Sequence, residues 1–234
     1  ELGVRLVGSE MCIRDSFDRE RVTEAEDRLV SQGYDTYVRT ATAFSTLGWF
    51  ADPVLPSLLS HGRITLANVI LHELFHSSVF FGGQTAFNES LANFAGHRGA
   101  IDFFEKENGL SSPEARAARA SWSRELQLSG LFENARQQLI FLYRSDGDPI
   151  FVMTKRKQLF QDLRENVERV TGQEALDVNS KPIVFNNAVV LQFSMYLEDL
   201  DLFERLYLQN RKNLKVALEE IIEVANDSPR PFLD

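Results

Sequence analysis

Apolar residues recur every three to four positions over most of this chain, and that spacing is typical of amphipathic helices. The segment 18–32 has this pattern and ends before Gly33, a residue that commonly follows the last turn of a helix. From residue 100 onward the pattern is helical almost throughout. It predicts the end of a helix begun near residue 88, then helices over 111–144, 150–170, about 185–199 and 200–224.

The segment 34–44 departs from the helical pattern. Tyrosine, threonine and valine are frequent there and partly alternate with polar residues, which predicts a strand. Residues 45–56 contain Gly48 and two prolines and are interpreted as a structured turn, with a further short strand over 50–58 left open. We therefore expect an α+β fold, mainly α, with a small N-terminal sheet and a C-terminal helical bundle.

Turn signals divide the helical part. Ser112-Pro113 is a strong start signal, and the Asp-Gly-Asp-Pro sequence of 146–149 predicts a turn. The two long helices on either side of that turn should form an antiparallel hairpin. The length of the first leaves a break near Ser129-Gly130 open. The single helix over 200–224 completes the bundle.

Composition places the chain among globular proteins with one substantial core. It has 234 residues and a net charge of −9, and no basic patch with interleaved aromatics is present, so a nucleic-acid partner is not expected. Its 18 phenylalanines mostly recur at helical spacing and are assigned to the core. Cys12 is the only cysteine, which excludes a disulfide framework. No apolar run reaches membrane-spanning length, and no signal peptide is visible.

The first sixteen residues are unusual. The segment 7–16 resembles translated sequencing-adapter read-through, so we expect residues 1–16 to be a non-native segment, the alternative being a genuine N-terminal arm. We treat 17–234 as a single domain. In it, residues 17–110 would form the sheet and the two helices that carry the candidate chemistry, and residues 111–234 would form the remaining helices.

That chemistry lies in the sequence His72-Glu73-Leu74-Phe75-His76, which follows the apolar run 64–71. Residues four apart lie on one face of a helix, so His72 and His76 can bind one ion, with Glu73 beside its open position. By chance, a chain of this length contains His-Glu-x-x-His about once in a hundred cases. Buried histidines and glutamates are costly unless they are hydrogen-bonded or metallated. The pattern therefore favours a zinc site.

A third ligand is expected downstream. Phe80-Phe81-Gly82-Gly83 should end the first helix, residues 84–87 should form a loop, and Glu89 should lie in the first turn of the next helix. A carboxylate there completes a His-His-Glu site with one coordination position left for water or substrate. The alternative for Glu89 is a carboxylate stabilised by the helix dipole. His97 is a rival ligand. Asn93, one turn beyond Glu89, could accept a hydrogen bond from a ligand imidazole.

These motifs resemble those of a known family. The His72-to-His76 motif with Phe87-Asn88-Glu89-Ser90-Leu91-Ala92 is similar to the gluzincin metallopeptidases. The segments 45–55 and 87–99, with Asn186-Asn187-Ala188 and Tyr196, resemble a bacterial family of predicted zinc-dependent aminopeptidases. The match runs from about residue 17 to near the C-terminus. It departs at Phe44, where the family usually has tyrosine.

The resemblance implies a zincin-like metallopeptidase domain whose sheet packs on the metal-binding helix. It also implies Zn²⁺ as cofactor, a peptide or protein as substrate, and a location in the cell envelope or periplasm. Asn88 belongs to the family motif and, with Asn93, is assigned a supporting role beside the ligands. Arg98 could bind a substrate carboxylate, but a structural salt bridge is the expectation.

Catalytic roles follow from this chemistry. Glu73 would take a proton from the attacking water and deliver it to the leaving amine. Tyr196 is our candidate donor to the oxyanion, because the resemblance includes its region; a core tyrosine is the alternative, and His97 and Tyr37 are reserves. Asp52 is a candidate partner for the substrate α-amine. The predicted strand before the metal helix could bind an extended peptide at its edge.

Two other functions remain open at this level. An endopeptidase would use the same chemistry without a device for the α-amine. A non-catalytic or regulatory protein could use zinc for structure or partner binding, although a purely structural site needs no general base such as Glu73. The oligomeric state is not specified by the sequence.

Overall fold

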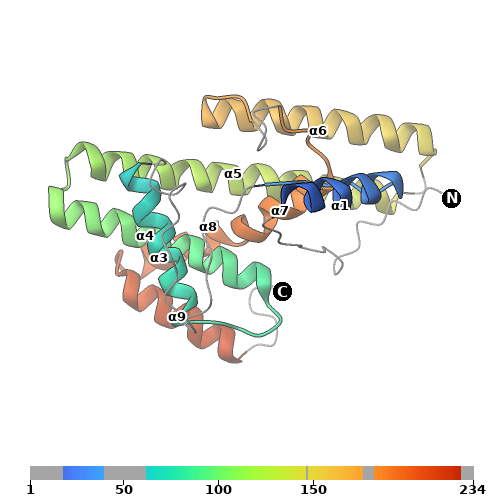
Figure 1. The fold of residues 1–234 in the computed structure, drawn as a ribbon. Coiled ribbons are helices and arrows are strands. Elements are labelled where there is room, and N and C mark those ends of the chain that lie inside the picture. Colours follow the sequence, from blue (N-terminus) through green and yellow to red (C-terminus); the bar gives the residue numbers. More distant parts are fainter. Residues whose placement is uncertain (1–17, 40–61, 146, 176–181, 228–234) are drawn as a thin grey trace. The chain divides into compact units, whose positions relative to one another are not determined.

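A computed structural model describes residues 18–39, 62–145, 147–175 and 182–227 (Figure 1). Regular structure in these ranges is helical, and no strand occurs in them. The helices are α1 (Arg19–Ser31), α3 (Arg63–His76), α4 (Thr85–Asn108), α5 (Pro113–Arg144), α6 (Pro149–Thr171), α7 (Asn187–Leu197), α8 (Leu200–Gln209) and α9 (Leu214–Asp227). Across the described ranges, no helix is both long and apolar enough to cross a lipid bilayer.

The predicted α+β fold with an N-terminal sheet is wrong for the part of the chain that the structure describes. Residues 34–39 form an irregular segment and not a strand. Side chains and backbone from the start of α7 bind this segment: Asn186 Nδ2 donates to Thr36 O over 2.9 Å, and Asn187 N donates to Asp35 Oδ2 over 3.1 Å. These bonds replace the pairing that a neighbouring strand would supply. The other proposed strand, 50–58, lies outside the described residues.

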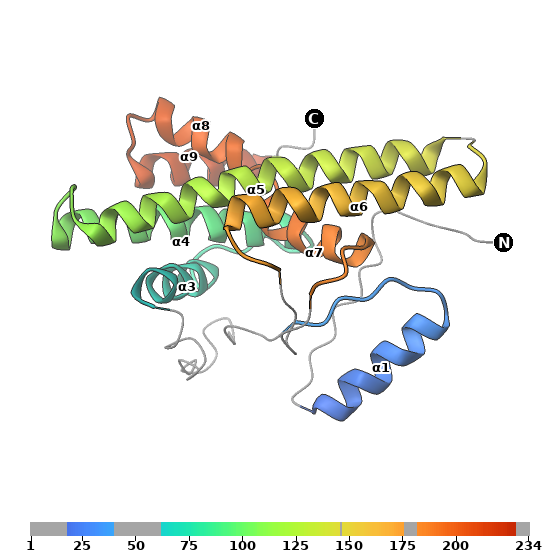
Figure 2. The ribbon, with the colours of Figure 1, turned by 90° about the horizontal axis from the view of Figure 1, so that it is seen from above.

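The chain forms two compact units, one built from residues up to Thr40 with Gly130–Ser194, the other from Ala41–Ser129 with Met195–Asp234. In the first unit, the C-terminal part of α5 and α6 run alongside each other in opposite directions (Figures 1 and 2), as the predicted hairpin requires. Their buried side chains recur at helical spacing: Phe132, Ala135, Leu139, Leu142, Phe160, Leu163 and Val167.

Local signals explain the bounds of these helices. Ser112 Oγ accepts a hydrogen bond from Ala115 N over 3.1 Å, which caps α5 just before Pro113. The helix continues without a break through Ser129 and Gly130. At the end of α6, Gly172 adopts a left-handed conformation with φ 72°, which glycine tolerates without strain.

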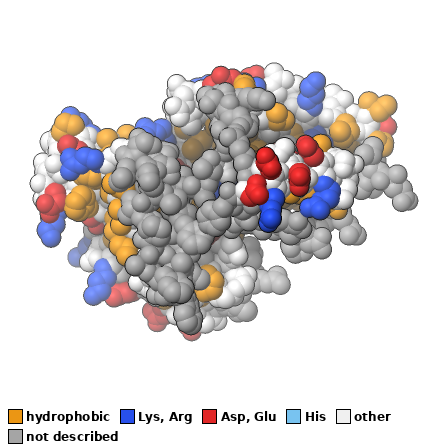
Figure 3. Space-filling model, in the orientation of Figure 1, with side chains coloured by type: hydrophobic (Ala, Val, Ile, Leu, Met, Phe, Trp, Pro, Cys, Tyr) orange, Lys and Arg blue, Asp and Glu red, His pale blue; other side chains and the backbone are white. Residues whose placement is uncertain are grey.

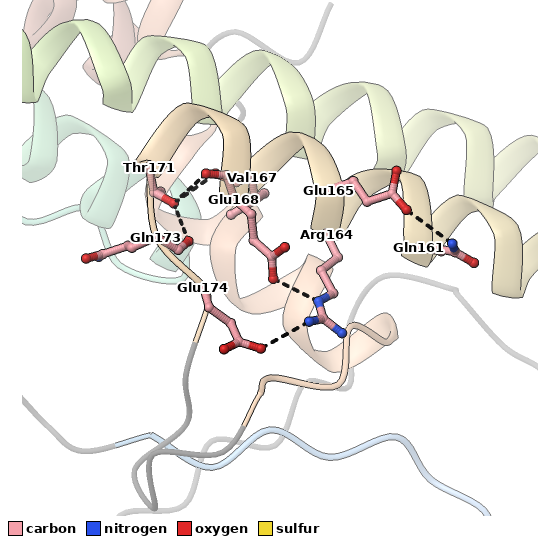
Figure 4. A network of polar contacts seen from close by, with 8 residues as sticks. All are labelled: Gln161, Arg164, Glu165, Val167, Glu168, Thr171, Gln173 and Glu174. Carbon is pink, nitrogen blue, oxygen red and sulfur yellow. Dashed lines mark hydrogen bonds and ion pairs between the residues drawn. The ribbon is translucent and has the colours of Figure 1, made fainter.

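Polar side chains cover parts of the surface of this unit, on α1 and α6. Figure 3 shows acidic and basic side chains gathered over α1, whose N-terminus is capped by Asp18 Oδ1 accepting from Glu20 N over 3.0 Å. Figure 4 shows the corresponding surface of α6, where Gln161 bonds Glu165 and Arg164 bonds Glu168 and Glu174. These groups lie three or four positions apart or just past the helix end, so they satisfy one another locally.

In the second unit, half of the 24 residues of α4 are buried, and this helix forms the centre of the core. Apolar residues from α5 and α8 pack against it. The centroid of the Phe94 ring, on α4, lies 5.8 Å from that of Trp122 and 5.7 Å from that of Phe203. Such aromatic contacts add to the free energy gained by burying apolar area. This core fixes the helix that carries the candidate ligand Glu89.

The predicted single helix over 200–224 is wrong: α8 and α9 are separated by a turn at 210–213. Arg211 and Lys212 have positive φ angles of 56° and 62°, which interrupts the helix. Asn213 Oδ1 then accepts from Val216 N over 3.2 Å and caps α9. The two asparagines that flank this turn, at 210 and 213, were the signal in the sequence.

Two glycines allow α3 and α4 to approach closely. A Cβ atom at Gly96 would lie 2.5 Å from Asn68 Oδ1 and 2.8 Å from Asn68 O, and one at Gly99 would lie 3.0 Å from Leu71 Cδ1. At Gly96 the obstacle includes the backbone of Asn68, one turn before His72, so only glycine fits there. At Gly99 the Leu71 side chain would have to shift. The crossing therefore sets the position of the turn of α3 that carries His72 and His76 against α4.

Candidate metal centre

The first two candidate ligands come from the last turn of α3. His72 and His76 are four positions apart, and their Nε2 atoms are 3.1 Å from each other. Their ring planes are nearly perpendicular, at 82°. The His76 side chain is buried and that of His72 is 14% exposed. The spacing of the motif thus brings both imidazoles to one point, as predicted.

The third candidate ligand, Glu89, comes from α4. Its Oε2 lies 3.4 Å from His72 Nε2 and its Oε1 lies 3.6 Å from His76 Nε2. Burial acts to raise the pKa of Glu89, but hydrogen bonds and charge from His72 and His76 outweigh it and lower the pKa to about 2. The carboxylate is therefore ionised at neutral pH, as metal ligation requires.

The three donors fit one tetrahedral ion. Bonds of about 2.0–2.1 Å from zinc to nitrogen and oxygen place tetrahedral ligand atoms about 3.3 Å from one another. The observed separations of 3.1, 3.4 and 3.6 Å bracket this value. In the described ranges, His72, His76 and Glu89 are the group of histidine, cysteine and acidic side chains that could hold a metal ion. Three protein donors leave one coordination position open.

The turn between α3 and α4 differs from the prediction. α3 ends at His76, before the predicted stop near Gly82, and α4 begins at Thr85 instead of near residue 88. Asn88 holds this turn: Phe81 N donates to Asn88 Oδ1 over 2.9 Å, and Asn88 Nδ2 donates to Phe81 O over 2.7 Å. Asn88 is the residue before Glu89. The two bonds therefore help to fix the position from which the Glu89 side chain points to the histidines.

Asn93 and Tyr196 meet beside the site. Asn93 Nδ2 donates to Tyr196 O over 3.0 Å, so its amide contacts the tyrosine backbone, whereas the sequence suggested a bond with a ligand imidazole. The Tyr196 ring lies 6.3 Å from the His72 ring between centroids, with planes 27° apart. The structure therefore places Tyr196 next to a candidate ligand. Its role as an oxyanion donor stays a prediction.

His97 is engaged away from the cluster. Its ring is buried, and its Nε2 lies 3.0 Å from Asn68 Nδ2 and 3.8 Å from Glu125 Oε1. Burial, followed by the positive potential of His72, Arg124 and Arg98, lowers the pKa of His97 to about 3. His97 is thus a neutral acceptor for the Asn68 amide, and its geometry does not support it as the rival third ligand.

Sequence reasoning missed Glu125. Burial raises its pKa to about 7, although a hydrogen bond with Asn93 and the charge of Arg124 oppose that shift. A signal was present in the spacing of α5. Glu125 stands three positions after Trp122 and four before Ser129, both buried, so it falls on the inward stripe of the helix. A carboxylate on such a stripe indicates a buried polar contact.

Arg98 forms the structural ion pair that we expected. Its Nε donates to Glu204 Oε2 over 3.0 Å, and Trp122 Nε1 donates to the same oxygen over 3.0 Å. The guanidinium carbon lies 4.2 Å from the centroid of the Tyr207 ring. Arg98 is therefore committed to α5 and α8 contacts within this unit.

The remaining candidates have separate outcomes. Glu73 is half-buried on α3, next to His72. Tyr37 belongs to the other unit, where its ring lies 6.2 Å from that of Phe193. The other candidates, Phe44, Asp52 and the segment 45–55, lie outside the described residues. Peptide binding at a strand edge and recognition of the substrate α-amine by Asp52 therefore stay predictions.

Comparison with known families gives one match. The family described as "Putative aminopeptidase" matches residues 9–230, which is nearly the whole chain. The chain belongs to this family. No curated protein and no solved structure matches it.

Proposed function

We propose that this protein is a zinc-dependent aminopeptidase whose ion is held by His72, His76 and Glu89. The carrying observation is the convergence of three donor atoms, two from α3 and one from α4, at separations of 3.1–3.6 Å. Membership of an aminopeptidase family supports a peptide as the substrate.

The chemistry is divided among the side chains of the site. Zinc, when bound, supplies a Lewis acid that lowers the pKa of a water molecule and polarises the scissile carbonyl. His72 and His76 supply neutral nitrogen donors, and Glu89 supplies a carboxylate that is already ionised. Three such ligands leave a place for water and substrate, which a closed structural site lacks.

Glu73 is the general base of this proposal. It removes a proton from the attacking water and later gives that proton to the amine of the departing fragment. The Tyr196 hydroxyl is the proposed donor to the oxygen that becomes negative during attack. Its ring beside His72 supports this role, because an oxyanion donor must lie close to the ion-binding side chains.

The test is the substitution Glu73→Gln, which preserves the shape of the side chain and removes the base. We expect zinc to remain bound in the variant and the rate of hydrolysis of aminoacyl fluorogenic substrates to fall about 10²- to 10⁴-fold. Zinc content is measured by elemental analysis on the same samples. The exposed Glu165→Gln on α6 is the matched control and should retain wild-type activity.

The same assays separate the alternatives. Full activity in Glu73→Gln would refute the assignment of the base. Bound zinc with no turnover in the wild type would instead indicate a non-catalytic zinc protein. Cleavage inside an unstructured protein, without release of N-terminal residues, would indicate an endopeptidase.

A further inference from the structure

The last turn of α7 ends beside the candidate metal centre, with the Tyr196 ring 6.3 Å from that of His72 between centroids. The final carbonyl groups of any helix have no N–H group one turn ahead, so they need another donor. α7 ends at Leu197, and Asp199 turns the chain with a left-handed φ of 56°, a conformation that residues other than glycine rarely adopt. The carbonyls of Tyr196 and Leu197 belong to this last turn.

Two side chains from other helices supply those donors. Asn93 Nδ2, on α4, donates to Tyr196 O over 3.0 Å, and Ser129 Oγ, on α5, donates to Leu197 O over 2.6 Å. Ser129 is buried and Asn93 is half-buried. Two consecutive carbonyls are thus bound from two directions.

Glu125 orients one of these donors. Asn93 lies close enough to Glu125 to oppose the rise of its pKa, and an amide nitrogen has two N–H groups, so Asn93 can serve Glu125 and the Tyr196 carbonyl together. Glu125 and Ser129 are four positions apart and share one face of α5. The group formed by Asn93, Glu125 and Ser129 is called the carbonyl clamp below.

We propose that the carbonyl clamp positions the Tyr196 ring beside His72. Asn93 and Ser129 fix the last turn of α7, and Glu125 fixes Asn93. Without the clamp, the last turn of α7 would lose its hydrogen bonds to α4 and α5, and the Tyr196 ring would move with its backbone. The effect of the clamp on catalysis rests on the proposed function, whereas its effect on the position of the Tyr196 ring does not.

The experiment compares Asn93→Ala with Asn166→Ala. Asn166 Nδ2 also donates to a backbone carbonyl, that of Asp162 over 2.7 Å, but on the exposed surface of α6. NMR spectra of histidine-labelled full-length protein report the ring-proton shifts of His72, which depend on a neighbouring aromatic ring. In Asn93→Ala these shifts should move toward their values in Tyr196→Ala. In Asn166→Ala they should match the wild type.

Kinetics supply the second readout. Displacement of a catalytic group by about 1 Å can lower a rate about 10²-fold, so we expect Asn93→Ala to lower kcat about 10- to 100-fold with little change in KM. In a Tyr196→Phe background, Asn93→Ala should add no further loss. A merely structural role would instead lower both backgrounds equally.

Two results would overturn the proposal. One is that Asn93→Ala leaves the His72 ring-proton shifts unchanged. The other is that Asn93→Ala lowers kcat equally in the wild-type and Tyr196→Phe backgrounds. Should Asn93→Ala fail to fold, Ser129→Ala releases the neighbouring carbonyl and must shift the same His72 signals. If the wild type shows no turnover, the proposed function fails, but the NMR comparison still decides whether the clamp places the ring.

Discussion

Glu89 and Glu168 are both glutamates paired with basic side chains, but the pairs are built differently. Glu168 bonds Arg164, four positions earlier on α6, at 2.8 Å, and 39% of the arginine side chain is exposed (Figure 4). Glu89 faces His72 and His76 on another helix, and only 14% and 8% of these side chains are exposed. The first pair needs one helix, whereas the second needs α3 and α4 to cross at a fixed place.

This difference explains why only one of the two arrangements suits metal chemistry. Surface pairs on one helix are solvated and contribute little to stability. The converging donors of α3 and α4 are largely buried, and their separation is set by the contact at Gly96 and by the turn bound to Asn88. The predictions below test this distinction.

The largest effect is expected from Glu89→Gln. The variant removes the charged ligand while preserving its shape, so zinc affinity at neutral pH should fall more than about 100-fold, since even loss of an outer partner costs 10- to 100-fold. Glu168→Gln, the matched change on α6, should bind zinc as the wild type does. Competition against a chromophoric chelator measures both. Equal affinities in the two variants would remove Glu89 from the ligand set.

The second prediction concerns the same substitution in two helices. Gly96→Ala would place its Cβ 2.8 Å from the backbone oxygen of Asn68, so we expect the free energy of unfolding to fall by about 1–3 kcal/mol. Gly130→Ala, on α5, meets nothing within 4 Å and should raise it by about 0.5–1 kcal/mol. Urea unfolding measures both, and changes of the same sign would contradict the close approach of α3 and α4.

The third prediction uses the buried carboxyl of Glu125. Its pKa is about 7 in the folded protein against 4.5 ordinarily, so the folded state holds a proton that the unfolded chain releases. The resulting stabilisation is fully present below pH 4.5 and is lost as the pH rises through 7. A shift of this size corresponds to about 3 kcal/mol, which we reduce to about 2 kcal/mol because the side chain is 28% exposed.

Glu125→Gln isolates this contribution. His97, which faces Glu125, acts in the opposite direction: its lowered pKa of about 3 gives stability that is present above pH 6.5 and lost as the pH falls. The two partly cancel in the wild type, with Arg124 charged throughout. We expect the variant to gain about 2 kcal/mol relative to wild type between pH 5 and pH 8. Urea unfolding of metal-free protein at both values measures this; a constant difference would contradict it.

The smallest effect is expected from Arg164→Ala. This change removes the exposed pairs with Glu168 and Glu174 (Figure 4), which water and salt already screen. The urea midpoint should stay within the error of the wild type in both low and high salt. A clear loss of stability would show that the α6 surface contributes more than its solvated pairs suggest.

The sequence predicted best what depends on neighbours along the chain. The helices α1, α5 and α6 follow caps, glycines and apolar spacing, and the spacing of His72 and His76 follows from one helical turn. Glu89 was predicted because only a short turn separates it from the histidines. The structure brings these three side chains together, and their roles remain the proposal made above.

What the sequence did not predict depends on partners distant in the chain. Residues 34–39 have strand-like composition, but their partners are Asn186 and Asn187, about 150 positions away, so no sheet forms in the described part. Glu125 was missed because its partners, Asn93 and His97, lie on another helix. Neither pairing can be inferred from periodicity, which describes one helix at a time.

The glycine contact has a consequence for how this protein can vary. The candidate donors, the turn that joins their helices and both contact glycines lie in one uninterrupted stretch, Arg63–Asn108. An exchange of residues outside that stretch alters the surroundings of the candidate site without deleting a donor atom. The candidate donors can therefore be inherited together, as one hairpin of two helices, while the rest of the chain varies.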